Sequence, residues 1–108
     1  MALDVASLLS ALTQAGQGLG GSLWNQIQTF ALPELHKIAI QIVAIERNID
    51  QFTPEGAKAL LDLQVTATVG VIVAMTTLTL LDVQRAINAI LQAVKSIVNQ
   101  AIGFALIA

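Results

Sequence analysis

Hydrophobic positions recur at steps of three and four residues in two long stretches of the chain. This spacing places one apolar stripe along an α-helix, where it forms a seam against other helices. We expect these positions to pack helices together, between copies of the chain above all. The seam residues are Ile38, Ile42, Ile45, Ile49, Val83, Ile87, Ile90, Val94 and Ile97.

A helix boundary separates the two stretches near residues 50–54. Thr53 can cap a helix N-terminus, Pro54 suits the first helical position, and Glu55 favours the positive end of the helix dipole. Because the connection is short, the flanking helices should be antiparallel neighbours. The sequence therefore predicts an all-α protein in which residues 1–108 form a single helical hairpin.

The two arms of this hairpin are expected at residues 2–51 and 54–106. The first arm is interrupted by glycines near residues 16–21 and again at Pro33, since proline removes one backbone donor. The second arm has no proline after its start, so it could run as one helix of about 75 Å, which leaves no compact core. The glycines form a loop or, with a G-x-x-x-G spacing, allow close helix approach. The close-approach glycines are Gly16 and Gly20.

Composition shifts the interpretation toward assembly. Only 11% of the residues are charged while 56% are hydrophobic, and the mean hydropathy is +0.76. The apolar residues are mostly aliphatic, with one Trp and no Tyr, whereas a ligand pocket usually includes more aromatic and polar groups. Two helices cannot hide this much apolar surface between themselves, so other copies or lipid must cover it.

An uncharged stretch runs from Leu63 to Leu81, between Asp62 and Asp82. Its length approaches that of a membrane span. Against a span, threonines are scattered through it, and both flanks are acidic rather than basic. Burial within a protein assembly is the alternative to a bilayer.

Polar side chains form a stripe on the second arm, at helical spacing. They could follow a phosphate backbone without reading bases, face solvent, or form amide hydrogen bonds between helices. A net charge of −2 argues against nucleic-acid binding by the whole surface, so any contact with DNA would be local. The DNA-facing candidates are Arg85, Asn88, Gln92, Lys95 and Asn99.

Catalytic and metal-binding constellations are not evident in the sequence. His36 is the only histidine and has no plausible triad partners. Asp50, Glu55 and Asp62 cluster around the turn but lack the spacing of a metal loop. Because the chain has no cysteine, it has no disulfide and no thiolate site. We expect a protein that is not an enzyme and has no cofactor or metal.

The order of an acidic tip, an uncharged middle and a basic stripe resembles the coat proteins of filamentous DNA viruses. The tip is residues 46–62, the middle is residues 63–81, and the stripe runs from Arg85 to Lys95. The size and hairpin plan are similar to the major virion protein of the bacilliform archaeal viruses called clavavirids. This resemblance implies many identical hairpins that form a shell around circular double-stranded DNA.

These features predict a self-assembling structural coat subunit of a helical, rod-like or filamentous virion. Its partners would be many copies of itself and double-stranded DNA, bound without sequence preference. The alternative is a membrane-embedded helical hairpin, such as a conjugative-type pilin or a small oligomeric membrane subunit. In that case lipid would be the partner, and the protein would lie in a membrane or an extracellular filament.

Overall fold

The computed structural model describes residues 2–108, which form four α-helices and one short 3₁₀ helix. No strand occurs in this range, so the predicted all-α class is confirmed. The 3₁₀ helix, η1, lies at the expected turn, and the helix after it begins at Pro54. The elements in order are α1 (Val5–Gln17), α2 (Leu23–Arg47), η1 (Ile49–Gln51), α3 (Pro54–Met75) and α4 (Leu80–Ile102).

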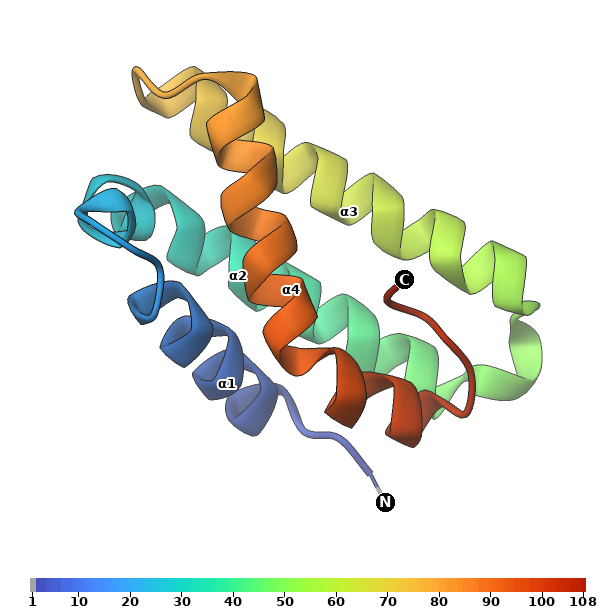
Figure 1. Cartoon of the computed structure of the whole chain (residues 1–108). Coiled ribbons are helices and arrows are strands. Elements are labelled where there is room, and N and C mark those ends of the chain that lie inside the picture. Colours follow the sequence, from blue (N-terminus) through green and yellow to red (C-terminus); the bar gives the residue numbers. More distant parts are fainter. Residues whose placement is uncertain (1) are drawn as a thin grey trace.

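The four helices pack into a short bundle rather than an extended hairpin. Helix α2 contacts both α1 and α3, and α4 crosses over α2 while it contacts α1 on one side and α3 on the other (Figure 1). The longest dimension is 41 Å and the radius of gyration is 13.4 Å, close to the roughly 13 Å expected of a compact domain of this length. The predicted 75 Å helix without a compact core is therefore wrong.

The second arm is divided because threonines end one helix and begin the next. The Thr76 hydroxyl donates to the carbonyl of Ile72 at 2.8 Å and accepts from the backbone N–H of Leu78 at 3.3 Å. Thr79 then caps α4, since its hydroxyl accepts from the backbone N–H of Asp82 at 3.2 Å. Threonine side chains compete in this way with the helix backbone for its hydrogen-bonding groups. The arm expected at 54–106 is thus α3 and α4 folded against each other.

The first arm is divided at only one of the two expected places. The glycine-rich segment separates α1 from α2, as predicted. Pro33, in contrast, lies inside α2 without ending it. The carbonyl that proline leaves without a partner belongs to Thr29, and both residues are exposed, so water can satisfy it. The predicted interruption at Pro33 is therefore wrong.

The seam residues lie mainly inside a single copy of the chain. Seven of the nine are buried in the hydrophobic core, Ile49 is half-buried, and Ile97 is 58% exposed. Because α4 folds back over α2, the seams of the two arms meet within one molecule. The prediction that they pack one copy against another is corrected for the buried seven: Ile38, Ile42, Ile45, Val83, Ile87, Ile90 and Val94.

The two candidate close-approach glycines differ in their surroundings. A methyl group added at Gly16 would collide with the ring of Trp24, which packs directly over it and joins α1 to α2. A methyl group at Gly20 would meet no atom within 4 Å. The structure therefore places a side chain, the indole ring of Trp24, rather than a helix backbone against Gly16, and it places no atom against Gly20.

Candidate assembly surface and strap

Helix α3 begins as the sequence predicts, and its orientation leaves one side uncovered. The Thr53 hydroxyl accepts from the backbone N–H of Gly56 at 3.0 Å, with Pro54 in the first turn. The side that faces α2 and α4 is buried at Ala57, Leu61 and Ile72, among others. The opposite side is exposed, although Thr66 and Gly70 at its edge also line a cavity shared with α4.

This outward side, which we call the α3 outer face, is uncharged. All of its residues are exposed, and they recur at helical spacing: Ala59, Leu63, Thr66, Ala67, Gly70 and Ala74. Leu63 is the largest of them and is 69% exposed. Small side chains allow a second helix to approach closely, since interaxial distance depends on the side chains at the contact. The α3 outer face is therefore suited to helix packing.

Further apolar side chains extend this surface past the end of α3. Met75, Leu80 and Leu81 are each more than half exposed around the turn that leads to α4. A contiguous apolar surface of this kind on a small protein marks a place of contact with another molecule or a membrane. The uncharged stretch of the sequence is thus divided in the folded bundle between buried residues, such as Val69 and Ile72, and exposed ones, such as Leu63 and Met75.

Within the described residues, α3 is also the one helix that is long and apolar enough to cross a membrane. Its best window has a mean hydropathy of 1.5, and only 22% of that window is buried in the bundle. The span considered in the sequence, residues 63–81, is not one helix, because it includes the turn between α3 and α4. Any span would be Pro54–Met75 instead.

The polar stripe of α4 is only partly available to a ligand. Arg85 and Asn88 are exposed and Lys95 is half-buried. Asn99 and Gln92 are occupied: their amides bind backbone groups of residues 103–108. Of the five side chains predicted to face DNA, Gln92 and Asn99 are therefore already hydrogen-bonded within the chain, and the DNA contact stays a prediction. Their amides do form hydrogen bonds between segments, but within one chain.

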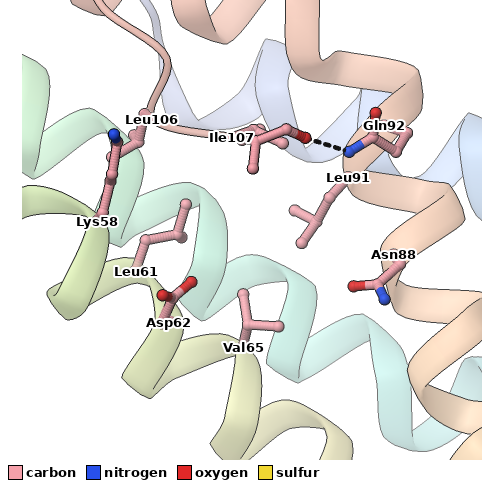
Figure 2. A pocket seen from close by; sticks show the side chains of 10 residues that line it. Lys58, Leu61, Asp62, Val65, Asn88, Leu91, Gln92, Leu106 and Ile107 are labelled. Atoms are coloured by element: carbon pink, nitrogen blue, oxygen red, sulfur yellow. Dashed lines mark hydrogen bonds between the residues drawn. The ribbon is translucent and has the colours of Figure 1, made fainter.

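Residues 103–108, which we call the strap, fold back from the end of α4 into the space between α3 and α4. Gly103 ends α4 with a φ of 94°, a left-handed conformation that glycine adopts without strain. The strap then places Leu106 and Ile107 in the core, at 4% and 5% exposure. Figure 2 shows both residues among side chains from α3 and α4.

Amide side chains of α4 hold the strap in place. Asn99 donates to the carbonyl of Ile107 at 2.9 Å and accepts from its N–H at 3.0 Å. Gln92 donates to the carbonyl of Ala108 at 2.6 Å, the dashed bond in Figure 2. One asparagine thus pairs with both backbone groups of a single residue, as a neighbouring strand would.

Two cavities lie along the groove between α3 and α4. One, of about 190 Å³, is bordered by the strap and by Leu61 and Leu91. The other, of about 380 Å³, is lined by residues that include Val69 and Leu80. They share Val65 and Asn88 as lining residues, so they belong to one groove, which the strap fills at one end.

Titratable side chains do not gather into a reactive site in the part of the chain that the structure describes. Among residues 2–108, no three His, Cys, Asp or Glu side chains lie close enough to hold a metal ion. His36 is exposed on α2. Glu34 is buried and pairs with Lys37 at 2.9 Å, an ion pair within one turn of α2.

The strap was not predicted from the sequence, although the sequence contains signals for it. A glycine just past an apolar helical repeat, as at Gly103, is a common helix end. The apolar residues that follow it, Leu106 and Ile107, then need a place to be buried.

Comparison with protein-family models, with curated proteins and with solved structures finds no match to this chain.

Proposed function

We propose that this chain is a self-assembling structural coat subunit, whose copies pack through the α3 outer face into a virion shell around DNA. The observation that carries this proposal is the uncharged α3 outer face, with Leu63 69% exposed, on a bundle that buries its hydrophobic core within one copy. Covering apolar surface contributes roughly 25 cal/mol per Å², so a shell that covers this face in every copy is favourable.

Self-packing accounts for this face better than insertion of the intact bundle into a bilayer. Helices α2 and α3 run antiparallel from the turn, which places Lys37 level with the middle of α3. The side chain of Lys37 is 58% exposed. If α3 spanned a bilayer within the bundle, this ammonium group would lie at hydrocarbon depth, at a cost of roughly 2.5 to 3.5 kcal/mol. Packing between copies leaves Lys37 in water.

We place the proposed DNA contact on the polar side chains of α4 that do not bind the strap. Arg85 and Lys95 are the cations of the stripe, and Asn88 lies between them. Asp82 lines the same cavity as Arg85, so the local positive charge is modest. Contacts of this kind would bind phosphate without reading sequence and would weaken as salt rises.

Substitution of Leu63 by lysine tests the assembly. Leu63→Lys places a charge on the α3 outer face, and Ile97→Lys places the same charge at another exposed aliphatic residue, on α4, which is 58% exposed. We expect Leu63→Lys to abolish particles in light scattering and electron microscopy while helicity persists, and Ile97→Lys to assemble. Equal assembly of both variants, or a wild-type protein that stays monomeric at high concentration, contradicts the proposal.

The DNA contact has a separate test. Exchange of Arg85 and Lys95 for Gln should lower the nucleic acid content of purified particles, while the same exchange at Lys58, on the turn side of α3, should leave it unchanged. An unchanged nucleic acid content in the Arg85 and Lys95 variant removes DNA from the proposal but leaves the assembly intact.

A second candidate function rests on the hydropathy of α3 and its 22% burial. In this alternative the bundle opens and Pro54–Met75 alone crosses a membrane, as in a small membrane subunit. Carbonate extraction separates the two: a membrane subunit stays with vesicles, whereas a coat subunit sediments as particles without lipid or detergent.

A further inference from the structure

The strap is attached to the bundle in a way that allows it to leave without unfolding a helix. It is held by the buried side chains of Leu106 and Ile107 and by three hydrogen bonds, two donated by Asn99 and Gln92 and one accepted by Asn99. Its connection to α4 is Gly103, whose φ is 94°. Because glycine also adopts negative φ readily, rotation at this one residue redirects the strap and leaves α4 intact.

The groove that receives the strap is formed without it. Its walls are α3 and α4, which also contact each other directly. The strap fills the end near Leu61 and Leu91, while the part near Val69 and Leu80 remains open as the larger cavity. The amides that bind the strap backbone, Asn99 and Gln92, belong to α4 and stay in place when the strap leaves.

We propose that in the assembly the strap of one copy occupies the groove between α3 and α4 of the next copy. This inference rests on the proposed self-assembly and adds to it a connection between copies. The occupant is the strap of a second copy because a segment that fits its own groove fits the identical groove of a neighbour. The exchanged form makes the same apolar contacts and hydrogen bonds as the closed one.

Two features of the structure favour exchange once copies are side by side. Helix α3 carries both the outer face and a wall of the groove, so in the proposed packing through α3 the groove of each copy borders the contact. A contact in which each copy donates its strap to the next is head-to-tail, and such contacts generate open filaments when they do not close into a ring. Exchange would thus link the subunits of a shell along its length.

Cysteine crosslinking tests the exchange, since the chain has no cysteine of its own. Asn88→Cys in the groove and Ala108→Cys in the strap both replace exposed residues and line the same cavity. The two substitutions are made in separate chains with different affinity tags, which are mixed, assembled and treated with a short bismaleimide. A matched mixture replaces Asn88→Cys by Ser10→Cys, an exposed position on α1.

We expect links between the two tagged chains in assembled material, at least about tenfold above the Ser10→Cys mixture, because neighbouring copies act at high effective concentration. Both cysteines placed in one chain should link within that chain in dilute monomer, and failure to do so overturns the position of the strap. Assembled particles in which the double variant links only within chains overturn the exchange but leave self-assembly standing. A wild-type chain that never assembles overturns both.

Discussion

Substitutions at Gly70 should distinguish the stability of a single copy from the packing between copies. Gly70 lies inside α3 at the edge of the outer face, beside the cavity shared with α4, and a methyl group added there would meet no atom within 4 Å. Glycine inside a helix is less favourable than alanine by about 0.8 to 1.0 kcal/mol. Gly70→Ala should therefore raise the free energy of unfolding of the monomer by about 1 kcal/mol, and Gly70→Leu by a similar amount.

The same leucine should weaken the assembly, because a large side chain at this position holds a second helix away. Helix axes approach to about 8 to 10 Å, depending on the side chains between them. A gap of only 0.5 to 1 Å already forfeits about a quarter to a half of the dispersion energy of each contact. Gly70→Leu is thus predicted to give a more stable monomer and a less stable particle.

Two measurements test this prediction. Urea unfolding followed by circular dichroism at low protein concentration reports the monomer, where association does not raise the apparent stability. Sedimentation across a concentration series reports assembly. Gly20→Ala is the control, because its added methyl also meets no atom within 4 Å but lies outside a helix. A Gly70→Leu protein that assembles at the wild-type concentration would refute the packing argument, and a destabilised Gly70→Ala monomer would refute the helix argument.

Three further predictions concern the stability of the bundle. The hydroxyl of Thr68 is buried and has no hydrogen-bond partner in the described chain, so Thr68→Val should raise the free energy of unfolding in urea by about 1 kcal/mol. Thr79→Ala removes the cap of α4 and should lower the same quantity by about 1 kcal/mol; an unchanged midpoint would show that the cap is dispensable. The backbone N–H of Ser7, followed by its side chain, lowers the pKa of Asp4 at the start of α1. This carboxylate therefore contributes stability that is present above its usual pKa and is lost as the pH falls through the lowered value. A pH series should show the difference between wild type and Asp4→Asn vanish in acid.

The fold class, and the helix boundary that is set by residues close to it in the sequence, could be predicted. Thr53 and Pro54 define a helix start by the chemistry of their own side chains, and α3 begins there. The same logic applies to Thr79, three residues before Asp82, which matches a known capping pattern. The absence of proline after Pro54 instead predicted one continuous helix. The second arm was therefore predicted as one helix, whereas the structure has two, α3 and α4.

The location of the seams could not be derived from their spacing. A stripe such as that of Ile87 and Ile90 indicates that one helix face is buried, but not whether the partner is the same chain or another copy. The turn at residues 76–79 decides this, because it brings α4 back over α2. The α3 outer face is the surface that stays exposed to other molecules. Its residues are mostly small, so their hydrophobic periodicity in the sequence is weak.

The contact between Gly16 and Trp24 also gives this protein a built-in optical reporter. Trp24 is the only tryptophan, the chain has no tyrosine, and the indole is 7% exposed where α1 meets α2. Emission above 300 nm therefore comes from this one junction. A red shift reports that α1 has separated from α2, even when total helicity is unchanged. Intrinsic fluorescence can thus follow loosening of the N-terminal helix, in monomer or particle, without any added dye.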